Sequence, residues 1–307
     1  MTVVVPTRDR SALLSTTLRS VLAQRGVSLE VVVVDDGSAD RTRDVVAGFA
    51  DGRLRLVRHE VPQRVSGARN SGIAAAAGTW VSFCDDDDVW APDKLAEQLA
   101  AARRLGRDWA YAGVVAVDDA LRPLSAPEEV LDQLPRHNAV PGGGSNVVAR
   151  RELLTRAGPF DVHLRNTEDW EMWLRLSQLG PPACAGRRLV GYRVHTANAS
   201  LDVGEILAGA ARIERLHHTR VDRGRIHRWL AESCLRQGRR GQAARHWAAA
   251  ARAGAATAVA ADIAVLLRRR LGAAGGADVP DWVREARVWL DPLAGADPGA
   301  PAVTGSQ

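Results

Sequence analysis

The sequence predicts an α/β protein, with a mostly parallel, Rossmann-like sheet in its first 200 residues and an all-helical region after them. Short β-branched runs alternate with helical segments from Thr2 to about Val194, which is typical of parallel strands joined by crossover helices. From Leu201 onward only helical periodicity remains. Acidic segments follow several strands, and ligands of open α/β sheets bind at that edge.

The first half alternates regularly between strands and helices. The run 29–34 is almost wholly apolar, as expected for a strand of a parallel sheet that is covered on both faces. Apolar residues of the first helix recur on one face and stop at Gly26, and Gly78 closes an alanine-rich helix. The expected strands are 2–5, 29–34, 54–57 and 79–84, and the expected helices are 13–22, 40–49 and 66–77.

The second half continues the pattern with a longer loop. Pro92 suits the first position of a helix, and Gly180 followed by two prolines ends another. The glycine-rich segment 141–146 is expected to be a flexible loop. The expected helices are 92–105, 151–157 and 168–179, and the expected strands are 109–117, 147–149 and 189–194.

We therefore expect three parts: a sheet domain over 1–200, a helical domain over 201–290 and a disordered tail over 291–307, which is rich in Pro, Gly and Ala. Residues 226–253 resemble one tetratricopeptide-like helical hairpin. One such unit cannot bury its own apolar face, so it needs neighbouring helices or a partner chain, for example in a homodimer.

The composition indicates an ordinary globular protein, with 46% apolar and 25% charged residues. The three cysteines are far apart and show no paired spacing, which argues against a disulfide framework or a zinc site. The chain enters a strand at once, without a signal-peptide pattern, so a cytoplasmic location is expected. No transmembrane segment is expected, because the nearest apolar run, 255–267, is short and contains Asp262.

The net charge of +5 is concentrated in the last third of the chain. Between Arg212 and Arg252 there are 11 arginines against 3 acidic residues, so this part could meet an acidic peptide, nucleic acid or an anionic membrane. A bias in composition explains the arginines equally well, since Lys94 is the only lysine. We expect no nucleic acid partner.

Four consecutive carboxylates, Asp85 to Asp88, close the fourth expected strand. Adjacent anions repel one another unless water or a cation intervenes. Mg²⁺ and Mn²⁺ prefer oxygen ligands, and these carboxylates follow the carboxyl end of a parallel strand. The run therefore favours a metal–phosphate site, although one or two of its members could serve only as an acidic cap for the helix at Pro92.

Three segments are expected to converge at this edge of the sheet: Pro6 to Asp9, Asp35 to Ser38 and the acidic run. A dinucleotide-binding domain would show G-x-G-x-x-G after its first strand, and a P-loop enzyme would show G-x-x-x-x-G-K-[ST]. Neither motif occurs. The crevice is therefore expected to hold a nucleotide-sized ligand through carboxylates and a metal.

With these segments in place, the sequence resembles the family 2 glycosyltransferases of the GT-A fold, over roughly residues 1–200. Any single piece is weak, but six in the right order are specific. The pieces are Val3-Val4-Val5-Pro6-Thr7-Arg8, Val33-Val34-Asp35-Asp36-Gly37-Ser38, Ala68-Arg69-Asn70-Ser71-Gly72, the acidic run with Trp90-Ala91-Pro92-Asp93-Lys94-Leu95, Glu168-Asp169-Trp170, and Tyr192-Arg193-Val194-His195.

The resemblance implies an inverting, metal-dependent transferase that moves one sugar from a nucleotide donor, UDP-linked by family default, to a hydroxyl or thiol. The acceptor could be a peptide, a glycan or a small natural product. No Gln-x-x-Arg-Trp follows Glu168-Asp169, and this absence, with the expected lack of membrane spans, counts against a processive synthase.

The roles that the resemblance implies fall into four groups. The catalytic base would be Asp169, with Glu168 as a weaker candidate. The donor-binding residues would be Pro6, Thr7, Arg8, Asp36, Arg69, Asp85 and Asp86. Mn²⁺ or Mg²⁺ would be held by Asp87, Asp85 and His195, and the extra Asp88 allows two registers of the motif. The acceptor side would include Trp170, Gly144 and Asn146.

Structural alternatives stay open for several of these residues. Asp36 with Gly37 could form only a turn, and Asp169 could only stabilise a helix N-terminus. His195 could be a structural histidine, and Trp170 could fill the core. Two rival functions also stay open. One is a nucleotidyltransferase, with Arg8 and Arg10 near a triphosphate, and the other is a catalytically inactive protein whose basic helices bind a peptide or an anionic surface.

Overall fold

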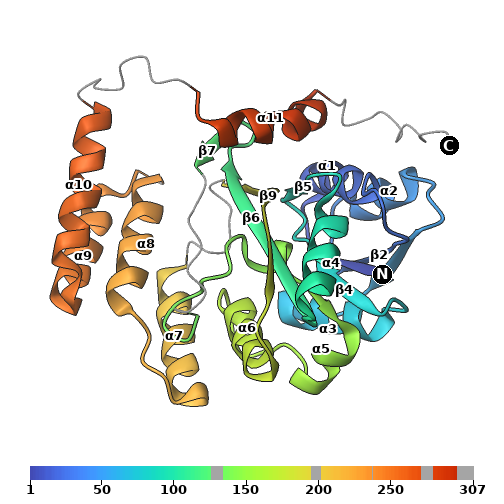
Figure 1. Cartoon of the computed structure of the whole chain (residues 1–307), viewed down its shortest axis with the longest axis horizontal. Coiled ribbons are helices and arrows are strands. Elements are labelled where there is room, and N and C mark those ends of the chain that lie inside the picture. The colour runs from blue at the N-terminus through green and yellow to red at the C-terminus, as the bar shows by residue number, and fades with distance from the viewer. Residues whose placement is uncertain (126–133, 195–201, 237, 271–278, 296–307) are drawn as a thin grey trace.

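The computed structural model describes residues 1–125, 134–194, 202–236, 238–270 and 279–295 (Figure 1). Its centre is one mixed sheet with the strand order β3-β2-β1-β4-β8-β6-β9-β5, and β7 pairs with β6 beside this path. The strands are β1 (Thr2–Thr7), β2 (Glu30–Asp35), β3 (Leu54–Arg58), β4 (Trp80–Phe83), β5 (Val89–Trp90), β6 (Trp109–Val117), β7 (Pro123–Ser125), β8 (Val148–Arg150) and β9 (Ala183–Arg193).

The parallel part of the sheet is its N-terminal half. Strands β1, β2, β3 and β4 pair in parallel, so β1, β2 and β4 all end at the same edge. Strand β8 is antiparallel to both β4 and β6, and β9 then runs parallel to β6. The expected α/β class is confirmed, and the segments after β1, β2 and β4 meet at one edge as expected.

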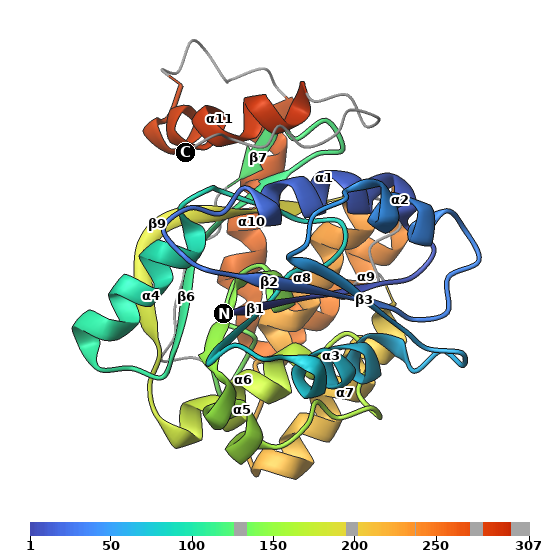
Figure 2. The ribbon, with the colours of Figure 1, turned by 90° about the vertical axis from the view of Figure 1, so that its right-hand side faces the viewer.

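Helices cover both faces of the sheet. Figure 2 shows α1 and α2 on one side of strands β1–β3 and α3 on the other side. The helices of the first 200 residues are α1 (Ser11–Leu22), α2 (Thr42–Gly48), α3 (Arg64–Ala75), α4 (Lys94–Leu105), α5 (Arg151–Ala157) and α6 (Glu168–Leu179), with a 3₁₀ turn, η2 (Gly143–Asn146), before β8.

Alternation along the strands builds two separate cores. Val3 and Val5 of β1 pack with Leu14 and Leu18 of α1, whereas Val4, between them, packs on the opposite face. Successive side chains of a strand point to opposite faces, so an uninterrupted valine run serves both cores. This explains why β1 and β2 lack the polar alternation of a half-exposed strand.

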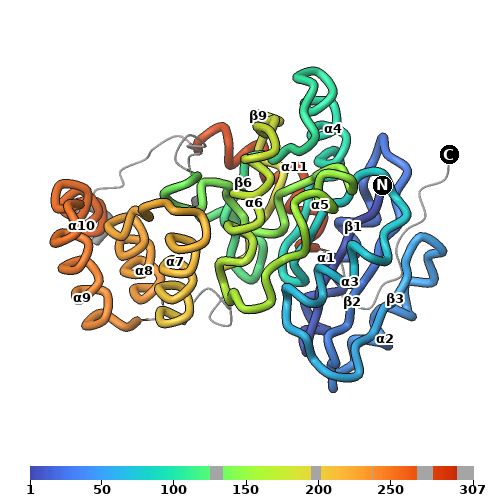
Figure 3. Tube along the Cα trace, turned by 90° about the horizontal axis from the view of Figure 1, so that it is seen from below, coloured from blue at the N-terminus to red at the C-terminus, as the bar shows by residue number. Residues whose placement is uncertain are grey.

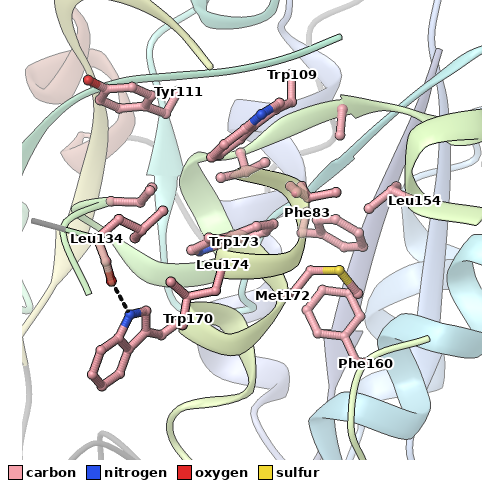
Figure 4. Close-up of a cluster of buried hydrophobic side chains, with 14 of the residues drawn as sticks. Phe83, Trp109, Tyr111, Leu134, Leu154, Phe160, Trp170, Met172, Trp173 and Leu174 are labelled. Atoms are coloured by element: carbon pink, nitrogen blue, oxygen red, sulfur yellow. Dashed lines mark hydrogen bonds between the residues drawn. The ribbon is translucent and has the colours of Figure 1, made fainter. Parts of the chain in front are cut away.

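The second core contains an aromatic cluster around Trp173 of α6 (Figure 4). The Trp173 ring stacks near Trp109, with centroids 6.4 Å apart, and meets Phe160 edge-on. The neighbouring Trp170 is also buried, and its Nε1 donates a hydrogen bond to the Leu134 carbonyl at 2.7 Å. This packing fixes the start of α6, which supplies Glu168 and Asp169.

Helices follow the sheet, as expected: α7 (Val203–His217), α8 (Arg223–Arg236), α9 (Arg240–Ala250), η4 (Ala251–Ala255) and α10 (Ala256–Arg270). Seen from below, α7, α8, α9 and α10 step progressively away from the sheet (Figure 3). Helix α7 packs on the α6 core through Ile206, Ala210 and Ile213, and α8 pairs with α9 through Ala231, Cys234 and Ala243. The expected hairpin over 226–253 thus coincides with α8 and α9.

The last helix, α11 (Asp281–Ala294), returns to the sheet instead of extending the helical region. Its Ala286, Trp289 and Leu290 pack against Val89 of β5 and Leu189 of β9. Figure 1 shows α11 beside β7, apart from α10. The segment 291–307, expected to be a tail, begins inside this helix, and residues 296–307 lie outside the described part of the chain.

One helical stretch of the described residues, 240–267, is long and apolar enough to cross a membrane, judged by length and composition alone. It is longer than the expected run 255–267 because α9 and α10 are joined through η4. Gly254, with φ of 92°, interrupts helical geometry between them, and only 11% of the apolar window is buried.

Replacing Gly72 by alanine is expected to lower the free energy of unfolding by about 2 kcal/mol, because overpacking outweighs the gain in helix propensity. A Cβ at this position of α3 would overlap the Val4 side chain of β1. The measurement is urea unfolding of both chains. Gly48→Ala is the matched control, since a Cβ there meets nothing within 4 Å. Equal stability of Gly72→Ala and the unsubstituted chain would contradict this packing.

Candidate functional site

A cavity of about 770 Å³ opens at the carboxyl ends of β1, β2 and β4. It continues past the start of α6 to α7 and α8, so its walls come from both the sheet and the helical region. Its sequence-predicted members are Pro6, Thr7, Arg8, Asp36, Arg69, Asp85, Asp86, Asp87, Gly144, Glu168, Asp169 and Trp170. The structure therefore brings twelve predicted residues to one cavity.

The inner wall of the cavity is formed by Arg10, Arg69, Asp85, Asp86, Asp87, Glu168 and Asp169. Arg69, from α3, connects two segments of this wall. Its Nη1 donates to Glu168 Oε1 at 2.8 Å, and its Nη2 donates to Asp85 Oδ1 at 2.7 Å. Burial alone would lower the pKa of Arg69, but the two carboxylates raise it above its ordinary value. Gly144 lies against the guanidinium so closely that a Cβ there would overlap it. Arg69 is thus a fixed positive charge between two functional segments.

The aspartates of the acidic run have different partners. Asp86 and Asp87 both accept hydrogen bonds from Arg10 Nη1, and Asp86 Oδ2 also accepts from Thr7 Oγ1 at 2.7 Å. Asp88 does not line the cavity, and its Oδ1 accepts from the Arg193 backbone N–H at 2.9 Å. Burial, with the charge of Asp87, raises the pKa of Asp86 to about 7 and that of Asp88 well above its ordinary value.

Helix α4 and the turn η2 hold the acidic run in place. Lys94 is fully buried, with Nζ 3.7 Å from the Trp90 ring centroid, and Trp90 Nε1 donates to the Ser145 carbonyl at 2.9 Å. Ser145 Oγ in turn accepts from the Asp85 backbone N–H at 2.9 Å. Burial lowers the pKa of Lys94 to about 7. These contacts set the distance between the strand end and the Gly143–Gly144 backbone.

The chemistry of the inner wall fits a divalent cation. Among the described residues, no group of three His, Cys, Asp or Glu side chains is already arranged as a metal site. However, five carboxylates line the cavity there, those of Asp85, Asp86, Asp87, Glu168 and Asp169. Arg10 and Arg69 pair with four of them, and Arg8 and Arg64 bring the guanidiniums that line this part of the cavity to four. Hard oxygen donors in excess of their counterions suit Mg²⁺ or Mn²⁺, particularly when a diphosphate adds negative charge. His195 lies outside the described residues.

Asp36 is positioned mainly by the backbone of α3. Its Oδ1 accepts from the Gln63 N–H and its Oδ2 from the Arg64 N–H, both at 2.7 Å, and His59 Nδ1 lies 2.7 Å from Oδ1. The carboxylate therefore satisfies the first N–H groups of a helix while it lines the cavity. Arg8 stands nearby, half exposed and paired with Asp9 at 3.5 Å.

Asp169 lies in the first turn of α6, on the cavity wall. Its Oδ2 accepts from Asn138 Nδ2 at 3.1 Å, and its Oδ1 accepts from the Trp170 backbone N–H at 2.7 Å. Burial, with the charge of Glu168, raises the pKa of Asp169 to about 7. A carboxyl group with that pKa can accept a proton near neutral pH far better than an exposed aspartate can.

Glu168 combines one satisfied and one unsatisfied oxygen. Its Oε1 pairs with Arg69, while its Oε2 is buried without a hydrogen-bond partner among the described residues. The neighbouring Thr167 Oγ1 is likewise buried without a partner. Thr167 Oγ1 lies against Gly209 of α7. Buried polar atoms are rarely left unsatisfied, so Glu168 Oε2, on a residue of the cavity wall, indicates a place for a ligand or water.

The acceptor residues expected from the sequence behave differently. Gly144 and Trp170 line the cavity. Asn146 is fully buried and is not among the lining residues, because its amide is bonded to β6 and to the loop before η2. Its Nδ2 donates to the Ala112 and Pro141 carbonyls, and its Oδ1 accepts from the Ala112 N–H.

Two parts of the cavity were not assigned to the glycosyltransferase site from the sequence, which named Arg10 only for the rival nucleotidyltransferase. Arg10 and Asn138 contact Asp86, Asp87 and Asp169, but nothing in the local sequence of either residue shows which carboxylate it meets. The second part is a face of α8. Its lining residues recur at helical spacing, a pattern that could have been found in the sequence. They are Arg225, Trp229, Glu232 and Arg236.

Comparison with known proteins gives consistent results. The model of the family described as "Glycosyl transferase family 2" matches residues 2–160. The succinoglycan biosynthesis protein ExoO of Rhizobium meliloti is 36% identical over 222 residues, which are 66% of this chain and 59% of that protein. The amylovoran biosynthesis glycosyltransferase AmsB of Erwinia amylovora is 30% identical over 221 residues, or 66% of this chain and 72% of AmsB.

A third relative, WfgD of Escherichia coli, is 28% identical over 179 residues, or 57% of this chain and 69% of WfgD. It is named a UDP-Glc:alpha-D-GlcNAc-diphosphoundecaprenol beta-1,3-glucosyltransferase. Among solved structures, residues 1–349 of S. aureus TarS in complex with UDP-GlcNAc superpose with a TM-score of 0.57 at 18% identity. That match covers 76% of this chain and 66% of the TarS chain, and it supports the shared fold.

Replacing Arg69 by leucine is expected to lower the free energy of unfolding by about 3 kcal/mol at pH 7.5, because Asp85 and the buried Glu168 lose their shared counterion. Urea unfolding measures the loss. Arg53→Leu breaks a more exposed pair with Asp51 and should cost about 0.5 kcal/mol. Similar losses in the two variants would show that the Arg69 bridge does not hold the inner wall together.

Proposed function

Because the chain belongs to the family 2 glycosyltransferases, we propose that it moves a single sugar from a UDP-linked donor to a hydroxyl of an acceptor, with inversion. The observation that carries this proposal is Asp169, a half-buried carboxylate with a raised pKa, in the same cavity as the aspartates that follow β4. One cavity thus offers a base and a diphosphate-binding wall, which a direct transfer between two substrates requires.

The donor would lie along the edge formed by β1, β2 and β4. Pro6, Thr7 and Arg8 would contact the nucleobase, and Asp36 would face it from the end of β2. Asp85 and Asp87 would hold Mg²⁺ or Mn²⁺, with Asp86 toward the ribose. When bound, the metal ion would offset the charge that develops on the departing nucleoside diphosphate. Arg10 and Arg69 would remain as fixed positive charges beside it.

Asp169 would act as the general base. The acceptor oxygen attacks the anomeric carbon from the face opposite the diphosphate, and its proton passes to Asp169 Oδ2. The bond between the anomeric carbon and the phosphate oxygen breaks, and its electron pair leaves with the nucleoside diphosphate. Asn138 would keep Oδ2 oriented, since its amide donates to that atom at 3.1 Å.

The relatives favour a saccharide as acceptor over the peptide or thiol alternatives. The name of WfgD describes glucosyl transfer to alpha-D-GlcNAc-diphosphoundecaprenol, and those of ExoO and AmsB describe succinoglycan and amylovoran biosynthesis. Family membership also favours a glycosyltransferase over a nucleotidyltransferase or an inactive binding protein. The experiment that tests the class is release of UDP from a panel of UDP-sugars, with and without saccharide acceptors. Absence of release throughout would overturn the proposal.

The pH profile of kcat/KM is expected to rise up to about pH 7 and then level off, because Asp169 must be ionised to accept a proton and its pKa is raised to about 7. Asn138→Ala removes a hydrogen bond to the ionised form and should move the rise to higher pH. Asp169→Asn should lower kcat by about a thousandfold. Asp44→Asn, at an exposed position of α2, is the control. A flat profile from pH 5 to 8 would argue against Asp169 as the base.

Removal of divalent cations by EDTA is expected to reduce transfer by at least about a hundredfold, because the inner wall has more carboxylates than guanidiniums. Added Mn²⁺ or Mg²⁺ should restore the rate. Asp87→Asn should raise the metal concentration needed for half-maximal activity by about tenfold. Full activity in EDTA would remove the metal ion from the proposal.

A further inference from the structure

We propose that the α8 face formed by Arg225, Trp229, Glu232 and Arg236 is the acceptor subsite, and that it takes a saccharide bearing a phosphate group. This inference rests on the proposed function and adds the chemical class of the acceptor. The four side chains line the outer part of the cavity that contains Asp169 at its inner wall. An acceptor can therefore contact α8 and the base within one continuous space.

The spacing of the four residues along α8 places them on one face of the helix. Positions 225, 229, 232 and 236 follow one another at intervals of four, three and four residues, so they lie along one side of α8. Ile226 and Leu230 flank this side of the helix and are buried in the core that also contains Trp170. Trp229 is different, since 39% of its surface is exposed. A large aromatic side chain is thus held by a rigid helix and left uncovered in the cavity.

An exposed indole in a cavity suits the apolar face of a sugar ring. Ligand cavities commonly combine aromatic walls with a few well-placed polar groups, which fix the orientation of the ligand. Ile206 and Ile226 extend the apolar surface next to Trp229. Glu232 supplies carboxylate oxygens that can accept hydrogen bonds from sugar hydroxyls.

The arginines of α8 differ in whether their guanidinium groups already pair with acidic residues. Arg228 forms a bidentate pair with Asp262, and Arg223 pairs with Glu214, so both tie helices together. Arg236 lies 3.9 Å from Glu232. The Arg225 guanidinium, by contrast, makes no hydrogen bond or ion pair among the described residues, and it faces the cavity. Guanidinium groups bind phosphate through paired N–H donors, so Arg225 is suited to an anionic ligand.

The distribution of charge along the cavity orients such an acceptor. With the donor bound, its diphosphate occupies the inner wall beside Asp85, Asp86, Asp87 and Glu168, so a second phosphate group is repelled there. The outer wall carries two guanidiniums, Arg225 and Arg236, against one carboxylate, Glu232, which lies 3.9 Å from Arg236. A phosphorylated saccharide would therefore enter with its phosphate near α8 and its free hydroxyls toward Asp169, which is the orientation that transfer to a hydroxyl needs.

The test is ligand-detected NMR titration of the full chain, with UDP and Mg²⁺ saturating the donor side. The probes are N-acetylglucosamine 1-phosphate, methyl N-acetylglucosaminide and inorganic phosphate. The unsubstituted chain should bind the sugar phosphate about tenfold more tightly than either other probe, because only that probe engages both Arg225 and Trp229. Arg225→Ala should remove this preference, and Trp229→Ala should weaken both sugar probes. Trp229→Phe, which keeps an aromatic face, should retain most of the affinity.

Arg245→Ala is the matched control, because it removes one exposed arginine of α9 that does not line the cavity. It should bind all three probes like the unsubstituted chain. Equal binding of the sugar phosphate and the methyl glycoside, or equal losses in Arg225→Ala and Arg245→Ala, would overturn the subsite. UDP-sugar turnover is measured separately. If binding depends on Arg225 but no donor is turned over, the subsite stands and the proposed transfer fails.

Discussion

The buried guanidinium of Arg69 is the contact on which the site depends. It joins the end of β4 to the start of α6 by binding Asp85 and Glu168, which are 16 and 99 residues away along the chain. A buried cation is tolerated only when anions surround it, and buried anions likewise need a cation, so neither segment is stable without the other. Gly144 is required beside the guanidinium because any side chain would displace it. The positive charge of Arg69 therefore holds three segments together: the end of β4, the start of α6 and the turn that contains Gly144.

The arrangement of these charges explains why the pKa values of Asp86 and Asp169 are raised. Arg69 satisfies one oxygen of Glu168 but makes no hydrogen bond to Asp169, so burial and the charge of Glu168 dominate there and raise its pKa. Arg10 spreads one positive charge over Asp86 and Asp87, and the pKa of Asp86 is raised as well. The fold thus gathers carboxylates that burial and mutual repulsion disfavour, which costs stability, in the cavity where their raised pKa values can serve chemistry.

Much of the fold was predictable, because periodicity and helix-ending residues act locally. The bounds of β6, α5 and α6 agree with expectation, since strong apolar patterns lie between glycines, prolines and polar residues. Convergence of the segments after β1, β2 and β4 followed from parallel topology. In contrast, the two-residue β5, the pairing of Arg10, the burial of Asn146 and the return of α11 depend on partners distant in sequence. No local pattern encodes such contacts.

The helices after α7 cannot be removed by a simple C-terminal truncation without disturbing the sheet. Helix α7 packs on the α6 core, and α11 packs on β5 and β9, so the excursion through α8, α9 and α10 is anchored at both of its ends. A deletion that simply stops before α8 would also strip the cover from β5 and β9 and expose their apolar residues to solvent. The contribution of α8, α9 and α10 should instead be measured with an internal deletion that joins α7 to α11, so that α11 still covers β5 and β9.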